Sequence, residues 1–466
     1  MRGPPDALVT RGNITRWTGV SGDARWAVHL FEVLARTTPR ASSPVSTSCV
    51  GRVRAATPAS QLLPASPRWS TVAFLVPPLS LSCRFTTGPD DSLRWCDRYG
   101  LPKMLAQDDK TTAKVRYQPK DEFHQRLQSE VGALLIGAAG QARRRLAVKI
   151  VVTSAWFYGS YACLVLLHLR TWQAVALVAS LGLSGAAVAM GTAHDAVHGT
   201  ISKSRRANAV VALLAAPFGI SRTWWRAKHN QLHHSFTNVH DVDDDLHFGR
   251  LLRLTPYQER RWWHRYQHVY AWLLYPLLYV AMLVNGDLEF ITRGVIGTTK
   301  VARPTPLRAL WLLAEKLTGL VLLLGLAALA HPLLHVLAAY LGAAAVAGLI
   351  MAVVFQTGHC LETTTFVRPE TTTGQVHQGW ALTQVAGTAD VATSNRLYTT
   401  FTGGLNHHVE HHLFPQANQL LLPEIASVVR RHCADNGVDV VVLPTLRAAV
   451  RSHQRLLRKL GHQPQL

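Results

Sequence analysis

Three short clusters of histidine are the part of this sequence best suited to chemistry. They read HDAVH (His194, His198), HNQLHH (His229, His233, His234) and HHVEHH (His408, His411, His412). Imidazole is a side chain that binds iron, copper, zinc and nickel in proteins. Eight imidazoles gathered in this way predict a metal centre that holds more than one ion.

The spacing of the first two clusters places pairs of rings on one side of a helix. Residues three or four positions apart share a helical face, so His194 and His198 can point at one ion, as can His229 and His233. His234 lies about 100° further round an α-helix than His233. We therefore expect His234 to bind a second ion or to bridge two ions.

The third cluster fits one face of a single helical turn, because its histidines stand at positions i, i+3 and i+4. A single zinc ion uses only about three or four protein ligands and would leave most of these rings unused. The spacing H-x-x-x-H also occurs at His331 and His335, in the apolar segment HPLLH. For that pair we expect a loop between membrane spans and no metal.

Composition indicates a membrane protein. Of the 466 residues 48% are hydrophobic, and they are concentrated in blocks. The net charge of +21 comes mostly from Arg that flanks the apolar blocks, so the positive-inside rule explains it better than nucleic-acid binding does. The Arg-, Ala-, Val- and Gly-rich composition is typical of a GC-rich bacterial genome, which predicts a bacterial plasma membrane.

The six cysteines are scattered and form no C-x-x-C pair, which excludes an iron–sulfur module of the usual type. If the metal centre is an oxidase, its electrons must therefore come from an external donor, such as a ferredoxin or a reductase.

Residues 1–103 differ from the rest of the chain. They hold 11 of the 23 prolines, with many Ser, Thr and Arg, and they predict a disordered extension. Translation starting near Met104 and an organellar transit peptide are alternatives for this segment. Residues 104–145 form an amphipathic cytoplasmic segment, 146–432 the membrane domain with its metal centre, and 433–466 a cytoplasmic C-terminal segment.

Four apolar segments have about the 20 residues that a membrane-spanning helix needs. They pair into two hairpins with tight turns, and the sequence therefore predicts an all-α integral membrane protein. The spans are Leu146–Leu169, Trp172–Met190, Leu307–Ala330 and Pro332–Phe355.

Two crossings return the chain to the side from which it started. All three clusters, and both termini, therefore lie on one side of the membrane. Arg143–Arg145, Arg222–Lys228 and Arg260–Arg265 fall on this side too, which makes it the cytoplasmic side. The segments Asn208–Ile220 and Arg261–Tyr279 predict interfacial helices, the first because it is short and the second because Trp, Tyr and Arg alternate in it.

These features resemble the membrane fatty-acid desaturase superfamily, whose pattern is H-x(3,4)-H, H-x(2,3)-H-H and (H/Q)-x-x-H-H with four spans. The resemblance covers about Lys114 to His432. The segments YQPKDEFHQRL, SRTWWRAKHNQLHHSFTN and GGLNHHVEHHLFP are similar to the acyl-lipid and acyl-CoA branch, which contains front-end and linoleoyl-CoA-type enzymes.

The resemblance implies a histidine-ligated di-iron centre in a cytoplasmic helical cap. It also implies a ninth ligand, His359, at the end of the fourth span. The implied activity is oxygen-dependent insertion of a cis double bond into a fatty acyl chain linked to lipid, CoA or a carrier protein. Iron and O2 supply the oxidant, because no side chain can remove hydrogen from an unactivated methylene. We expect no catalytic side chain beyond the metal ligands.

Two departures from the family pattern bear on specificity. Front-end enzymes typically carry Gln at the position of His408, which puts front-end regiochemistry in doubt. Many of them also carry a cytochrome b5 domain with an HPGG motif, which this sequence lacks.

Other polar residues predict supporting roles. Asp195, Glu410 and the acidic run Asp241, Asp243, Asp244 and Asp245 can accept hydrogen bonds from ligand imidazoles and so orient them. A solvated loop is the alternative for the acidic run. Arg222, Arg226 and Lys228 are candidates for holding the substrate headgroup.

Three other functions use similar residues. A hydroxylase, ketolase or acetylenase of the same superfamily shares the histidine pattern. A metal transporter needs ionisable ligands within its spans, whereas these lie at span ends. A zinc protease needs H-E-x-x-H, which is absent.

Overall fold

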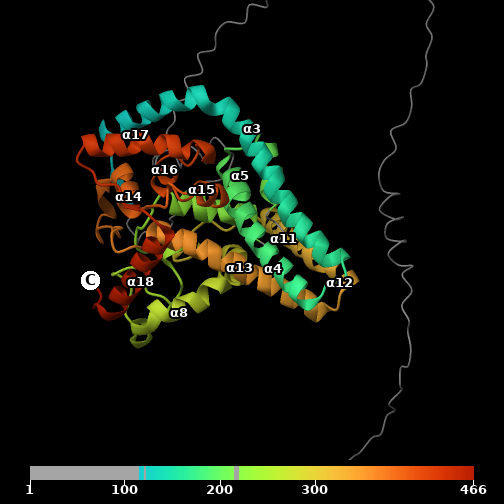
Figure 1. Cartoon of the computed structure of the whole chain (residues 1–466). Coiled ribbons are helices and arrows are strands. Elements are labelled where there is room, and N and C mark those ends of the chain that lie inside the picture. Colours follow the sequence, from blue (N-terminus) through green and yellow to red (C-terminus); the bar gives the residue numbers. More distant parts are fainter. Residues whose placement is uncertain (1–114, 120–121, 215–219) are drawn as a thin grey trace, which may run out of the picture. The chain divides into compact units, whose positions relative to one another are not determined.

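The computed structural model describes residues 115–119, 122–214 and 220–466, and the expected N-terminal extension lies outside the described residues. Four long helical stretches run side by side through this part of the chain (Figure 1). They are α3 (Glu122–Leu166), α4 (Thr171–Val188), α11 with η8 and α12 (Pro306–Leu320, Val321–Gly325, Leu326–Ala330), and α13 (Leu333–His359).

These four stretches expose apolar side chains along much of their length. Val151, Leu166, Leu310, Leu329 and Leu334 are among the exposed large hydrophobic residues. Exposure on this scale is unfavourable in water and favourable in a lipid bilayer. All four stretches are long and apolar enough to cross a membrane, so the protein is a membrane protein. Helix α3 begins at Glu122, well before the expected first span, so residues 122–145 of the amphipathic segment continue into the span as one helix.

A fifth stretch in the described part of the chain also has the length and composition of a span, at Trp262–Arg293. The sequence predicted an interfacial helix that ended at Tyr279. The structure has a longer stretch broken by 3-10 and π turns: η5 (Trp262–Tyr266), α8 (Gln267–Leu274), η6 (Tyr275–Leu277), α9 (Leu278–Ala281), η7 (Met282–Gly286) and α10 (Asp287–Arg293).

Three contacts place this fifth stretch within the fold. Its first turn packs on α18 (Leu446–His462), where a Cβ at Gly461 would lie 2.2 Å from the carbonyl oxygen of His264. Just after its last turn, the Thr298 hydroxyl donates to the carbonyl of Asp241 at 2.9 Å. Its middle packs on α13, because Gly348 leaves room for the carbonyl of Pro276.

Short helices and small sheets form a cap at one end of the long helices (Figure 1). A core of apolar side chains joins the N-terminal part of α3 to α14, α16 and α17. The cap helices are α5 (His194–His198), α6 (Arg205–Ala212), α7 (Arg222–Arg226), η3 (Ala227–His233), η4 (Asp244–Leu246), α14 (Trp380–Gly387), α15 (Arg396–Phe401), α16 (His408–Leu413), η9 (Gln419–Leu421), α17 (Leu422–Asp435) and α18.

Three two-stranded pairings tie together segments of the described chain. Strand β1 (Arg116–Gln118) pairs in parallel with β4 (Gln375–Gly379), and β5 (Asp390–Val391) in parallel with β6 (Val442–Leu443). Strands β2 (Val295–Ile296) and β3 (Thr299–Lys300) form an antiparallel hairpin. The two parallel pairs fix the N-terminal and C-terminal ends of the described chain to the cap.

Two π-helical turns carry the first two histidine clusters. The turn η1 (Ala189–Ala193) leads from α4 into α5, and η3 carries His229 and His233. A π turn has an extra residue compared with an α turn, and such turns occur frequently at functional sites. Because the His234 N–H bonds to the carbonyl of His229 at 3.0 Å, five residues back, the two rings lie on the same side.

Candidate metal centre

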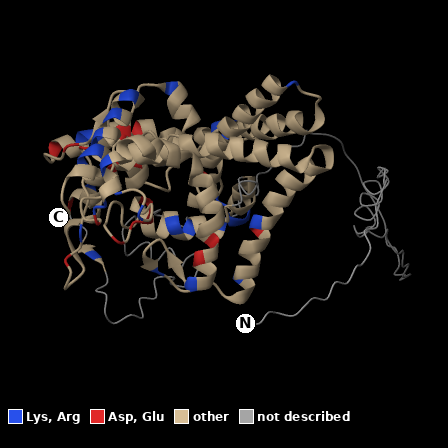
Figure 2. Cartoon of the chain, turned by 90° about the horizontal axis from the view of Figure 1, so that it is seen from below, with Lys and Arg blue, Asp and Glu red and all other residues tan. Residues whose placement is uncertain are grey.

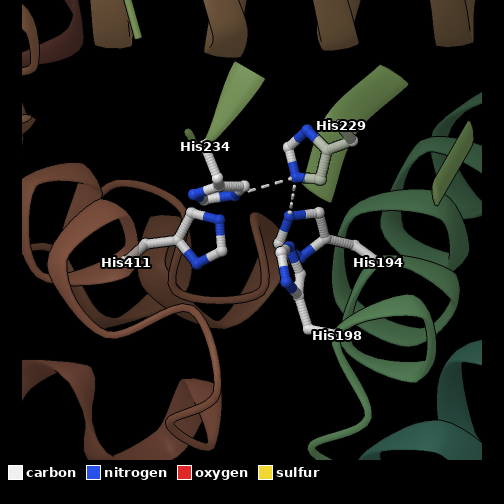
Figure 3. A group of neighbouring side chains, drawn as sticks. All are labelled: His194, His198, His229, His234 and His411. Carbon is white, nitrogen blue, oxygen red and sulfur yellow. Dashed lines mark hydrogen bonds between the residues drawn. The ribbon is translucent and has the colours of Figure 1, made fainter. Parts of the chain in front are cut away.

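Five buried histidines from three segments converge in one group. His194 and His198 come from α5, His229 and His234 from η3 and its end, and His411 from α16 (Figure 3). Each offers a ring nitrogen within 4.8 Å of the others. The π turn explains the place of His234: on a regular α-helix it would point away from the partners of His229, whereas here the two Nε2 atoms are 3.2 Å apart.

The other four histidines form a second group beside the first. His233, His359 and His412 offer nitrogens within 4.8 Å of one another, and the Nε2 of His408 lies 2.7 Å from that of His359. His359 ends α13 and is 4% exposed. The structure therefore brings together all nine histidines that the sequence and the family resemblance indicated.

The separations between these nitrogens fit a shared ion. The Nε2 atoms of His194 and His229 are 2.9 Å apart. Two nitrogens bound at right angles to one ion, each about 2.1 Å from it, would be roughly 3 Å apart. By contrast, His331 Nε2 donates to the Val165 carbonyl at 3.0 Å, near the opposite end of α13.

Unsatisfied ring nitrogens test whether a metal fits. Within the described part of the chain, five nitrogens of the two groups are buried and have no hydrogen-bond partner: His194 Nδ1, His198 Nε2, His234 Nδ1, His411 Nε2 and His412 Nε2. A buried nitrogen left in this state costs about 1–3 kcal/mol, and binding of a metal ion removes that cost where the nitrogen is a ligand. The donor set, which consists of neutral nitrogens with few carboxylates, fits iron or another transition metal.

Electrostatics keeps most of these rings neutral. Burial first, and the neighbouring histidines next, lower the pKa of four of them far below the ordinary value: His229, His234, His411 and His412. The same causes lower the pKa of His408 to about 3. A neutral imidazole has a free lone pair, which is the form that binds a metal.

His233 differs because it has a carboxylate partner. Its Nδ1 lies 2.9 Å from Oδ1 of Asp243, which is buried. Burial opposes protonation, but Asp243 and Asp245 outweigh it and raise the pKa of His233. Of the acidic run that the sequence indicated, Asp243 is thus placed to orient a ligand, whereas Asp241 has 72% of its side chain exposed.

Gln384 contacts another ring of the second group, and no sequence motif indicated this residue. Its Oε1 accepts from the Thr237 hydroxyl at 2.7 Å and lies 3.0 Å from Nδ1 of His412. Gln384 is fully buried on α14, and it is not part of any histidine cluster or other recognisable motif. Only its place in the fold reveals the contact.

The two other acidic candidates are placed differently. Asp195 Oδ1 lies 3.7 Å from Nδ1 of His194, too far for a hydrogen bond, and its Oδ2 accepts from Gln419 at 2.9 Å. Glu410 faces away from the nine histidines. Its closest polar neighbours are His407, at 4.0 Å, and Asp390, which with burial raises the pKa of the Glu410 carboxyl well above the ordinary value.

The three basic residues that are candidates for binding the headgroup lie in two different places. Arg222 and Arg226 line a recess of about 280 Å³ together with Arg205 and Arg206. Lys228 lies elsewhere and pairs with Asp244 and, at 2.7 Å, with Asp245. Although burial lowers the pKa of Lys228, the two carboxylates outweigh it and raise the pKa. Lys228 therefore has its charge balanced within the protein.

Two cavities reach the histidines. A cavity of about 530 Å³ extends to His359, and a smaller one of about 50 Å³ reaches His194. Trp225 and Phe355 line both cavities, and the Trp225 ring stacks on His229 with 5.1 Å between centroids. Arg222 lines both the smaller cavity and the basic recess, so these two spaces adjoin.

Comparison with known proteins identifies the family. The model of the family described as fatty acid desaturase matches residues 170–443, which include all nine histidines. The chain belongs to the fatty acid desaturase family. It is therefore an oxidoreductase that acts on fatty acyl chains, and neither the hydroxylase-type nor the transporter alternative is favoured. The predicted superfamily and activity are confirmed.

Individual relatives agree with the family. The chain is 29% identical to the sn-1 linoleoyl-lipid 6-desaturase of Synechocystis sp. over 75% of its length and 99% of the relative's. It is 29% identical to the enzyme of the same name from Arthrospira platensis, over 76% of its length and 97% of the relative's. It is also 32% identical to the acyl-lipid (8-3)-desaturase of Physcomitrium patens, over 66% of its length and 62% of the relative's.

Proposed function

We propose that this desaturase is a di-iron, oxygen-dependent enzyme that introduces a cis double bond into a lipid-linked fatty acyl chain. The observation that carries the proposal is the division of nine buried histidines into two adjoining groups, one of five and one of four. A single ion cannot use so many ligands, and two ions can. Iron bound there would supply, with O2, the oxidising power that an unactivated methylene requires.

The side chains of this protein would hold, orient and enclose the two irons. His233 takes its orientation from Asp243, and His412 from Gln384 and Thr237. The His408 Nδ1 donates to the carbonyl of Leu405 at 2.9 Å, which directs its Nε2 toward His359. Such contacts fix the ring that binds the metal and make it a better ligand.

The acyl chain would lie along the wall that the two cavities share. Trp225 and Phe355 form this wall and bring a bound chain close to His194 on one side and His359 on the other. The larger cavity has a volume within the range of about 300–1,000 Å³ that is usual for small-molecule sites. Its lining includes Lys228, Asp244 and Asp245, whereas the smaller cavity is lined mainly by apolar side chains.

We propose a four-span topology in which the histidines, both ends of the described chain and the cap are cytoplasmic. The stretch Trp262–Arg293 would enter the membrane beside α13 and return without crossing. A fifth crossing would place His194 and His412 on opposite sides of the membrane. The histidine groups to which these two residues belong lie next to each other, so both must be on the same side. The basic segments on the cap side agree with a cytoplasmic orientation.

The headgroup would bind at the recess of Arg222 and Arg226, because Arg222 also lines the small cavity next to His194. Guanidinium groups bind phosphate oxygens in bidentate fashion. Arg222 pairs with one carboxylate, Glu315, at 3.5 Å, whereas Lys228 pairs with two and is the weaker candidate.

A lipid carrier is supported by the names of relatives that cover most of this chain, which are linoleoyl-lipid and acyl-lipid desaturases. They include 6- and (8-3)-desaturases. An acyl-CoA carrier remains the alternative.

The test is expression of the full chain in a host without polyunsaturated lipids, followed by gas chromatography of its fatty acids and metal analysis of the purified protein. A new cis-unsaturated acyl chain in the phospholipid or glycolipid fraction, with about two irons per chain, is the expected result. A hydroxylated product, or one stoichiometric zinc with no iron, would contradict the proposal.

A further inference from the structure

The outer face of α18 is a basic surface that the catalytic site does not use. Its exposed residues are Arg447, Arg451, Gln454, Arg455, Arg458, Lys459 and His462. The helix contains no Asp or Glu, and no acidic residue follows Asp439 in the sequence. Figure 2 shows Lys and Arg gathered in the region where the C-terminus lies.

The neighbouring segment extends this basic surface. The first turn of η5 packs on α18 and brings Arg260, Arg261 and Arg265 beside it. Two carboxylates partly offset the charge: Glu259 pairs with Arg261 at 2.7 Å, and Glu362 pairs with Arg455. The eight basic side chains on α18 and before or within η5 therefore outnumber the two acidic ones that pair with them.

The inner face of α18 leads directly to a histidine of the metal centre. His453 is 1% exposed, and its Nδ1 donates to the carbonyl of Cys360 at 2.8 Å. Cys360 follows His359 in the chain, and the His359 ring belongs to the second histidine group. One helix, about 10–12 Å across, thus separates the basic surface from the backbone that carries this ligand.

We infer that this α18 surface is the docking site of the external electron donor, and that the donor is a small acidic one-electron carrier protein. The inference rests on the proposed function. Desaturation removes two hydrogens from the acyl chain and reduces one O2 to two waters, so it needs two further electrons and two protons per turnover. No iron–sulfur or haem motif in this chain can supply those electrons.

Charge and proximity together favour this assignment. An acidic carrier is attracted to the basic surface over about a Debye length, 8–10 Å at moderate salt. A carrier docked there would be separated from His359 by the width of α18. The hydrogen bond from His453 to the carbonyl of Cys360 connects this helix to the residue that follows His359.

A membrane surface is the less favoured occupant of the same face. The exposed side chains of α18 are all polar or charged, so they offer no apolar groups for insertion between lipids. The adjacent η5–α8 stretch does offer them, because Trp262, Val269 and Leu273 are exposed. That stretch is the one suited to the membrane interface, and α18 presents its basic face to water.

The test uses the full-length protein in nanodiscs and an acidic plant-type [2Fe–2S] ferredoxin as the probe. The double variant Arg451→Glu, Arg458→Glu is compared with Arg396→Glu, Arg431→Glu, which makes the same change in net charge at exposed positions elsewhere in the cap. Three quantities are measured: the Kd for ferredoxin at two salt concentrations, turnover with ferredoxin, and turnover with dithionite and a small mediator.

We expect the α18 variant to bind ferredoxin at least about tenfold more weakly and with less dependence on salt, while its iron content and dithionite-driven turnover stay at the wild-type level. The control variant should bind as the wild type does. An unchanged Kd in the α18 variant, or an equal loss in both variants, would overturn the inference.

A different result would indicate that the surface binds the membrane: the α18 variant would lose turnover only in nanodiscs of anionic lipid, with its Kd for ferredoxin unchanged. That result would also overturn the inference. Failure of the wild type to desaturate with dithionite would count against the proposed function instead, because the ferredoxin Kd is measured without turnover.

Discussion

The Asp243 carboxylate accepts a hydrogen bond from the His233 ring, with 2.9 Å between Oδ1 and Nδ1. Because a carboxylate can only accept, this contact places the proton of His233 on Nδ1 and leaves Nε2 for a metal. The second carboxylate oxygen accepts from the Asn238 N–H at 2.9 Å, so Asp243 is itself held in place. His233 is thus presented to the second histidine group in one tautomer and one orientation.

Asp243→Asn should lower both iron content and desaturation by about 10- to 100-fold, the usual effect of losing such a partner. The variant removes the negative charge and keeps the size of the side chain. Asp241→Asn is the matched control, since Asp241 is exposed and contacts no histidine of the two groups. Iron per chain and product yield in paired expression strains measure the effect, and equal values for both variants would contradict it.

His359→Ala should abolish desaturation as fully as His229→Ala, although His359 lies in none of the three clusters. Its Nε2 faces that of His408 at 2.7 Å. His331→Ala should leave activity nearly unchanged, because His331 precedes α13, whose 27 residues span roughly 40 Å. Acyl-chain unsaturation compared across the three strains checks this. An inactive His331→Ala with an active His359→Ala would refute both the ligand set and the topology.

Gln384→Ala should reduce desaturation by roughly 10-fold or more, since it removes the acceptor beside Nδ1 of His412. Gln384→Glu retains an acceptor oxygen in the same place and should recover most of the iron content. Metal analysis of the two purified variants separates an orienting role from a packing role. If Glu and Ala behave alike, the side chain only fills space.

Acid should loosen α18 through His453. Burial lowers the pKa of His453 to about 4, against an ordinary value near 6.5. The stability that the neutral ring contributes is therefore complete above about pH 6.5 and is lost as the pH falls from about 6.5 to 4, where the unfolded chain binds a proton that the folded chain does not.

His453→Gln should reduce the pH slope of unfolding in this interval by about one proton. His462→Gln, on the exposed end of the same helix, is the control. Hydrogen exchange of α18 between pH 7.5 and 5 measures the effect, and identical slopes in the wild type and His453→Gln would contradict it.

Deletion of residues 1–103 should leave desaturation intact. The segment lies outside the matched family residues 170–443, and its composition does not support a core. Product analysis of the truncated chain, with its membrane insertion checked in parallel, tests this. Normal insertion with no activity would reveal a role for the segment.

The sequence indicated which histidines the fold brings together, because metal binding restricts both residue type and spacing. It could not predict the place of His234, because the π turn in η3 depends on packing that no local pattern records. Gln384 was missed for a related reason: a buried amide on an ordinary helix carries no signal until its neighbour, His412, is placed beside it.

For the membrane spans, too, the local sequence predicted some features and tertiary contacts were needed for others. Apolar length alone identified the four long stretches, whose composition is close to that of the bilayer core. The same criterion also accepts Trp262–Arg293, so the number of crossings cannot be predicted from apolar length alone.

The order in which the ligands leave the ribosome has a consequence for assembly. The five-histidine group draws on both α5 and α16, and the other group needs the end of α13, so neither group is complete until His411 and His412 have been made and both hairpins are inserted. If the two groups bind iron as proposed, tight binding requires the completed arrangement, and metal binding is therefore coupled to correct folding of the membrane domain. Iron starvation should accordingly lower the amount of protein that survives in the membrane, since chains without metal retain buried unsatisfied nitrogens at the junction of α5, α13 and α16.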